Sequence, residues 1–143
     1  MAILNYTTKI SSDKTVGEIQ SILGRGGAKS VALDYENKRP SAVLFRLQFD
    51  NGQNINFRLP CNTSGVLNAM GNDRKVPRSS VNTEQAERTA WRIIKDWIEA
   101  QMAIVEAGQA VIEEVFMPYA VMPSTNKTMF QHFAENSQKL LTE

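Results

Sequence analysis

Cationic side chains gather near the start of a helix that the sequence predicts beyond residue 82. Arg88, Arg92 and Lys95 follow i, i+4, i+7 spacing, which places them on one stripe of that helix. Guanidinium groups hold phosphate through paired hydrogen bonds, and the indole ring of the neighbouring Trp91 can stack on a base. The helix N-terminus adds positive potential. This chemistry indicates a nucleotide or a nucleic acid as the ligand.

Two other segments extend the predicted site. The polar loop over residues 72–81 carries further cations immediately before the helix, and Arg58 lies at the end of a predicted strand, next to Pro60. Pockets form readily where a strand ends beside a short helix. We therefore predict the following ligand-binding residues: Arg58, Arg74, Arg78, Arg88, Trp91, Arg92 and Lys95.

A plainer interpretation of these cations stays open. Acidic residues on the same helix are near enough to neutralise part of the stripe: Glu84, Glu87, Asp96 and Glu99. The stripe would then be a solvated helix face with salt bridges. On the sheet, alternation places Arg46 and Arg58 on one polar face, where Arg46 would pair with Asp34.

Residues for catalysis or metal binding are scarce in this chain. His132 is the only histidine and Cys61 the only cysteine, so a nucleophile with a histidine base would have to use His132. No cluster has the spacing of a metal site. The glycines over residues 24–27 follow a helix, which is typical of a C-cap, whereas a phosphate loop precedes one. We expect no enzyme activity, no catalytic residue, no metal and no cofactor.

Composition sets the class of protein. The chain has 143 residues, 42% of them hydrophobic and 22% charged, as in an ordinary globular domain, and a net charge of +1. That charge provides no global attraction to nucleic acid or to an anionic membrane. A single cysteine fits a reducing compartment, and neither a secretion signal nor a membrane span is visible. We expect a cytoplasmic protein.

The elements that position these residues begin with a sheet. Residues that favour strands predict a first strand over residues 2–10. Alternating hydrophobic residues predict strands over residues 30–36, 42–49 and 53–59, with an Asn51-Gly52 turn between the last two. A capping box over residues 15–18 starts a helix between the first two strands. The order β-α-β-β-β predicts an antiparallel sheet with one hydrophobic face.

One long helix dominates the second half. Asn82 and Gln85 form a capping box, two apolar rows follow, and no proline intervenes before Pro118. This predicts a helix of more than about thirty residues, roughly 50 Å long. Gly108 is a point where it would bend or break. Either the two halves fold back together at Gly108, or the distal half pairs with a second copy.

The fold class is therefore α+β, in one domain over residues 1–143. Residues 1–61 form the sheet half, residues 62–122 the helical half with a short helix over 62–71, and residues 123–143 a terminal helix or tail. The two apolar rows exceed what one sheet face can bury, so we expect a homo-oligomer, a dimer or higher.

Four stretches resemble a family of small bacteriophage and prophage proteins. They lie at residues 57–61, 76–78, 90–97 and 116–119, and the marker Trp-Arg-Ile-Ile-Lys-Asp-Trp is the most specific of them. In size, element order and basic loop, the chain is also similar to phage anti-defence sponges of the anti-Thoeris type. That resemblance implies an oligomer that sequesters cyclic ADP-ribose isomers or cyclic nucleotides. No functional residue is carried over from it.

Three functions compete on these grounds. The first is a phage anti-defence protein that binds a cyclic nucleotide or ADP-ribose-derived signal without cleaving it. The alternative is a phage protein that binds nucleic acid, or one that inhibits a host defence effector such as a CRISPR nuclease. The third is a purely structural oligomer.

Overall fold

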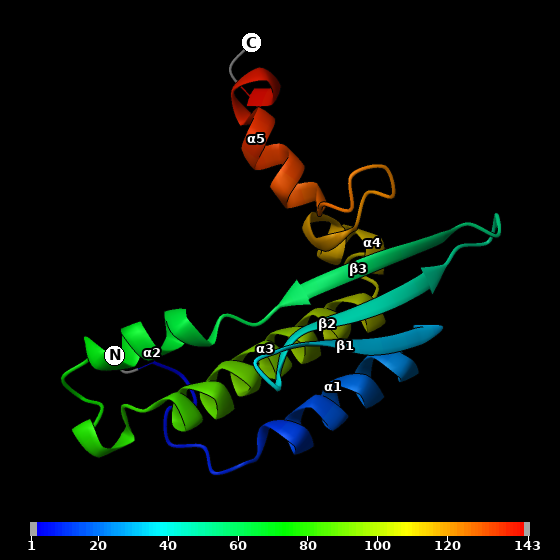
Figure 1. Ribbon diagram of the computed structural model, residues 1–143. Helices are drawn as coiled ribbons and strands as arrows, with labels where there is room; N and C mark the ends of the chain where they lie inside the picture. The colour runs from blue at the N-terminus through cyan, green and yellow to red at the C-terminus, as the bar shows by residue number, and fades with distance from the viewer. Residues whose placement is uncertain (1–2, 142–143) are drawn as a thin grey trace.

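The structure is a computed structural model that describes residues 3–141, with side chains as far as residue 136 in the last helix. These residues form an α+β fold with a three-stranded antiparallel sheet and five α-helices (Figure 1). In chain order the elements are α1 (Ser12–Arg25), β1 (Ser30–Glu36), β2 (Arg39–Gln48), β3 (Asn54–Pro60), α2 (Thr63–Gly71), a 3-10 turn (Arg78–Ser80), α3 (Thr83–Glu106), α4 (Ile112–Phe116), a second 3-10 turn (Met117–Tyr119) and α5 (Met129–Leu141).

The antiparallel meander β1-β2-β3 confirms the three later strands of the prediction. Asn37 and Lys38 both have positive φ in the first tight turn, and Gly52 has φ +84° in the second. Strand pairing sets Phe45 opposite Phe57, and their rings stack with centroids 5.0 Å apart. The alternating pattern thus places one hydrophobic face toward the helices.

The predicted first strand, over residues 2–10, is wrong for the residues that the structure describes. Residues 4–7 form a turn, in which Asn5 has φ +64° and its carbonyl accepts a hydrogen bond from the Thr8 N–H. Side chains of α3, Gln85 and Thr89, donate hydrogen bonds to backbone carbonyls of this segment. These bonds take the place of hydrogen bonds to a neighbouring strand. Ala2 lies outside the described residues. The order is therefore α-β-β-β rather than β-α-β-β-β.

α1 and α3 lie side by side on the hydrophobic face of the sheet (Figure 1). α1 begins one turn earlier than predicted, because Ser11 caps it by accepting from the Lys14 N–H. It ends at Arg25, inside the predicted glycine-rich stretch over residues 24–27, and Gly26 is its C-cap. Ile19 and Leu23 of α1 are fully buried in the core, together with Trp91 and Ile98 of α3.

α3 starts as predicted, with the Asn82 side chain accepting from the Gln85 N–H, but its predicted length is wrong. It has 24 residues and ends at Glu106, and Gly108 follows with φ +75°. The chain then turns back, and α4 brings Phe116 edge-on to Trp97 and Phe45 in the core. Within this chain the long helix therefore breaks at Gly108, and the distal half packs back against the core.

Two helices flank this core. α2 lies within the predicted short helix and is capped by Asn62, and Met70 at its C-terminal end packs in a second, smaller core with Val76 and Ala86. α5 matches the predicted terminal helix and extends away from the sheet (Figure 1). Residues 142–143 of the predicted terminal segment lie outside the described residues. Across residues 3–141, no helix is long and apolar enough to span a membrane.

Candidate functional site

Trp91, the predicted stacking platform, has no exposed surface. Its side chain lies in the main core, and its indole N–H has no hydrogen-bond partner among the described residues. A fully buried ring presents no face to a ligand. The sequence contained a signal for this outcome, because Trp91 falls on an apolar row with Ile94 and Ile98.

Arg92 and Lys95 are engaged by acidic neighbours. Arg92 Nη1 lies 2.6 Å from Glu18 Oε2 and donates to Thr15 Oγ1 at 3.3 Å, which ties α3 to α1. Lys95 Nζ lies 2.8 Å from Glu99 Oε2 along the same helix. Both cationic side chains are only 13% exposed. Here the plainer interpretation, a helix face with salt bridges, describes the geometry better than an anion site does.

Arg78 closes the loop that connects α2 to α3. Its guanidinium donates to the Gly71 carbonyl at 2.9 Å and to the Asp73 carbonyl at 3.2 Å, with longer bonds to Met70 and Val76. The Met70 and Gly71 carbonyls belong to the last turn of α2 and the other two to the loop after it, so Arg78 caps the C-terminal end of α2. Arg74 is exposed in the same loop. Lys75 is also exposed there, so two cations of this loop face solvent, whereas Arg78 is engaged by backbone carbonyls.

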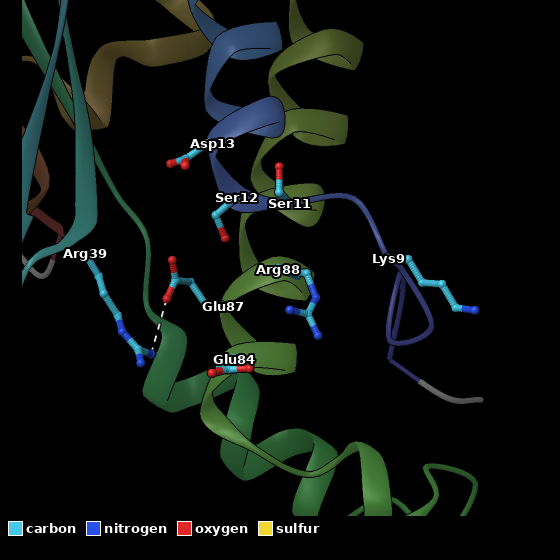
Figure 2. A pocket seen from close by; sticks show the side chains of 8 residues that line it. All are labelled: Lys9, Ser11, Ser12, Asp13, Arg39, Glu84, Glu87 and Arg88. Atoms are coloured by element: carbon cyan, nitrogen blue, oxygen red, sulfur yellow. Dashed lines mark ion pairs between the residues drawn. The ribbon is translucent and has the colours of Figure 1, made fainter.

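Arg88 lines a cleft of about 330 Å³ between the N-terminal ends of α1 and α3, which we call the helix-end cleft (Figure 2). Lys9 and Arg39 also line it, and neither was among the predicted site residues. The Arg88 guanidinium donates to Gln85 Oε1 at 2.6 Å, and Arg39 Nη1 lies 3.3 Å from Glu87 Oε2. These residues meet only because the first hairpin and the N-terminal segment both reach α3.

The charges of the helix-end cleft cancel. Three basic residues among those lining it are matched by three acidic ones, namely Asp13, Glu84 and Glu87. Figure 2 shows Glu87 directed toward Arg39, while the Arg88 side chain lies on the other side of α3 from that pair. An anionic ligand would meet as much repulsion as attraction in this cleft.

A second cleft, of about 430 Å³, lies on the sheet face that is turned away from α1 and α3. We call it the outer-face cleft, and its polar lining residues are Ser30, Asp34, Arg46, Asn56, Arg58 and Asn126. Strand register pairs Arg46 with Asn56 and Leu44 with Arg58, so the two arginines are diagonal neighbours on one face. The sequence predicted this shared face. The sequence could not reveal that Asn126, from a distant segment, forms one wall of the cleft.

Ion pairing inside the outer-face cleft differs from the expectation. Asp34 pairs with Arg58, with Oδ2 and Nη2 3.5 Å apart, and Arg46 Nε instead donates to Asn56 Oδ1 at 3.1 Å. Arg58 and Asp34 are each 45% exposed. The cleft therefore carries two arginines against one carboxylate, which is the excess that an anion requires.

The loop over residues 120–128 forms the remaining wall. The Val121 N–H donates to the Asn56 carbonyl at 2.8 Å, which fastens the loop to the edge of β3. Asn126 has φ +59°, and its N–H donates to the Met122 carbonyl at 2.8 Å. Asparagine tolerates this left-handed conformation better than most residues. The Asn126 amide is thereby held at the cleft by a closed turn.

Cys61 lies between β3 and α2, and its thiol is buried and ionises with difficulty. Burial raises the pKa of Cys61 from 9.0 to about 12, and the negative charge of Glu87 adds to the effect. The thiolate is the nucleophilic form, so this cysteine is poorly suited to catalysis at neutral pH.

The raised pKa of the Cys61 thiol predicts slow thiol labelling in the folded protein. At about pH 8, a thiol-reactive dye should label native protein far more slowly than protein unfolded in guanidinium. Glu87→Gln should accelerate labelling modestly, since it removes the smaller of the two causes. The unfolded thiol ionises first, so its contribution to stability is present below pH 9.0 and is lost as pH rises toward 12. Equal labelling rates for folded and unfolded protein would contradict the burial.

Compared with known proteins, the chain matches no family model, no curated protein and no solved structure. Over the described part of the chain, no group of three or more His, Cys, Asp or Glu side chains is placed to hold a metal ion. The candidate site therefore rests on geometry alone. Of the seven predicted residues, Arg58 lines the outer-face cleft and Arg88 the helix-end cleft, and the other five line neither.

Proposed function

We propose that the protein binds a small phosphate-bearing ligand in the outer-face cleft and holds it without converting it. The ligand class that we favour is a cyclic nucleotide or an ADP-ribose derivative, sequestered in the manner of a phage anti-defence sponge. The resemblance to such sponges suggested this class. One observation carries the proposal: Arg46 and Arg58 line one cleft from adjacent strands, with a single carboxylate against them.

The spacing of the two arginines suits a phosphate. Diagonal neighbours on an antiparallel pair lie roughly 7–8 Å apart, within reach of two long side chains that converge on one anion. Each guanidinium can donate two parallel hydrogen bonds to phosphate oxygens. The Arg58–Asp34 pair is half exposed, and exposed pairs contribute about 1 kcal/mol or less, so a phosphate can replace Asp34 as the partner of Arg58.

Amide groups in the same cleft supply hydrogen bonds for the rest of the ligand. Asn56 and Asn126 each present a donor and an acceptor, which is the combination that an adenine edge accepts. The residues lining the outer-face cleft include no histidine or cysteine, and its one carboxylate is paired. These features favour retention of a ligand over its chemical conversion.

A small ligand suits this cleft better than a nucleic acid does. The fastened loop over residues 120–128 closes one side, whereas a nucleic-acid strand needs an open track of phosphate contacts and exposed rings for stacking. The net charge of +1 also provides little long-range attraction. Nucleic-acid binding therefore becomes an outcome of the test rather than a second proposal.

The experiment begins with purified protein, heated to release any bound molecule for mass spectrometry. Isothermal calorimetry then measures binding of a panel of cyclic nucleotides and ADP-ribose isomers. Each of Arg46→Ala and Arg58→Ala should weaken binding roughly tenfold or more, because each removes charge-assisted hydrogen bonds, and the double variant should abolish it. Arg74→Ala, which removes an exposed arginine of the α2–α3 loop, is the matched control and should change nothing.

Three results would overturn the proposal. Absence of binding to every member of the panel would exclude this ligand class. Loss of binding in Arg74→Ala with retention in the double variant would move the site to the α2–α3 loop. Tight binding of oligonucleotides, with affinity that falls steeply as salt rises, would instead identify a nucleic-acid protein.

A further inference from the structure

The two edges of the sheet differ. On the β3 edge, Phe57 bridges to Ala120 and the Val121 N–H reaches the Asn56 carbonyl, so the loop over residues 120–128 covers part of that strand. On the other edge, β1 pairs with β2 alone among the described residues. An edge strand presents a row of unpaired N–H and C=O groups, which is a template for another strand. β1 therefore offers the chain a place to bind an extended partner.

Side chains along β1 are incompletely covered. Val31 and Leu33 pack at the border of the core but remain partly exposed, and the Tyr35 side chain is 63% exposed. The regular stretch is short, because the pairing with β2 shifts register between Asp34 and Tyr35. A partner strand would thus meet about five residues, Ser30–Asp34, and would cover the exposed parts of Val31 and Leu33.

The sequence of this stretch complements itself in the antiparallel direction. With a two-fold axis through Ala32, Val31 of each copy lies opposite Leu33 of the other on the core side. Ser30 lies opposite Asp34 on the outer side, where the hydroxyl can donate to the carboxylate. An axis through Asp34 would instead oppose two like charges. The Ala32 axis gives each side chain a compatible neighbour.

Charge follows the same symmetry. Lys29 precedes β1, while Asp34 and Glu36 lie toward its other end. Antiparallel pairing of two copies brings the basic beginning of one strand toward the acidic end of the other. Opposite charges at these positions stabilise the pairing, whereas a parallel arrangement would place like charges together.

We infer that a second copy of this chain pairs with β1 in antiparallel orientation about Ala32, which extends the sheet to six strands. Ser30, Ala32 and Asp34 also line the outer-face cleft, so the two clefts of the dimer lie on one continuous face, on either side of the axis. The contact is through the sheet edge, not through the distal helix that the sequence suggested. It stands whether or not a nucleotide is the ligand.

The test uses charge at the axis. Wild-type protein should sediment as a dimer in analytical ultracentrifugation at low ionic strength. Ala32 is exposed in the subunit, so Ala32→Lys and Ala32→Glu leave the subunit core intact while each places like charges opposite one another. Each variant alone should raise the dimer dissociation constant roughly tenfold or more, and an equimolar mixture should restore the dimer as a heterodimer.

Asn54→Lys is the matched control, since it adds the same charge at an exposed position of β3, the strand at the opposite edge of the sheet. It should leave the dissociation constant unchanged. A wild-type protein that is monomeric at all concentrations would overturn the inference. So would a dimer that tolerates both Ala32 variants, because its interface would lie elsewhere. A dimer weakened by Ala32→Glu but strengthened by Ala32→Lys would exclude the Ala32 axis, since lysine would then face Asp34.

Discussion

Replacement of Trp91 with alanine should lower the free energy of unfolding by about 3–5 kcal/mol, the range for removal of a large buried aromatic side chain. Trp91 is fully buried in the main core, among its largest side chains. The cost has two parts, lost burial of hydrophobic surface and a cavity that the surrounding helices cannot fill. Chemical denaturation followed by circular dichroism would measure it, with fluorescence of Trp97 as a second probe.

Trp91→Phe is the informative partner of this variant. Phenylalanine keeps most of the buried surface and removes the indole N–H, which lacks a hydrogen-bond partner among the described residues. A buried unpaired donor costs free energy, so its removal offsets part of the cost of the small cavity that phenylalanine leaves. We therefore expect Trp91→Phe to cost about 1 kcal/mol, far less than Trp91→Ala. Loss of ligand binding in Trp91→Ala without loss of stability would restore Trp91 as a ligand platform.

Gln85→Ala should lower the free energy of unfolding by about 2–3 kcal/mol. The Gln85 amide donates to the Tyr6 carbonyl at 2.8 Å and to the Thr8 carbonyl at 2.9 Å, and the side chain is only 9% exposed. Two partly buried carbonyls of the N-terminal segment would lose the amide group that donates hydrogen bonds to them. This segment is not a strand, so these side-chain bonds replace the sheet bonds that it does not make.

Arg88→Ala provides the control for Gln85. It removes the donor to Gln85 Oε1 but leaves both bonds from the Gln85 amide to the N-terminal segment. It should cost less than about 1 kcal/mol. Limited proteolysis should also cleave the N-terminal segment faster in Gln85→Ala than in Arg88→Ala. Equal stability of the two variants would mean that Gln85 does not fasten this segment.

Local rules in the sequence were enough for much of the secondary structure. Alternation and tight-turn residues predicted the meander, because side-chain direction along a strand is set by the backbone itself. Asn82 and Gln85 predicted the start of α3, because a cap needs only neighbouring residues. The break at Gly108 was one of two alternatives. Choosing between them required knowing that Phe116 fits against Trp97 and Phe45.

The candidate site depended far more on tertiary structure. Helical spacing predicted one stripe for Arg88, Arg92 and Lys95, but spacing does not reveal which cations have partners. Arg92 meets Glu18, a residue of another helix, so its engagement could not be inferred from α3 alone. The outer-face cleft likewise depends on Asn126, which a turn far along the chain brings to β3.

The sequence by itself determined that the polar residues of the meander share one face, and hence that Arg46 and Arg58 point the same way. Only the tertiary structure decided that these two arginines line a cleft, and that Arg78, Arg92 and Trp91 serve the fold. The physical reason is that periodicity is local, whereas the partner of a charge and the burial of a ring are set by segments that meet only when the chain is folded.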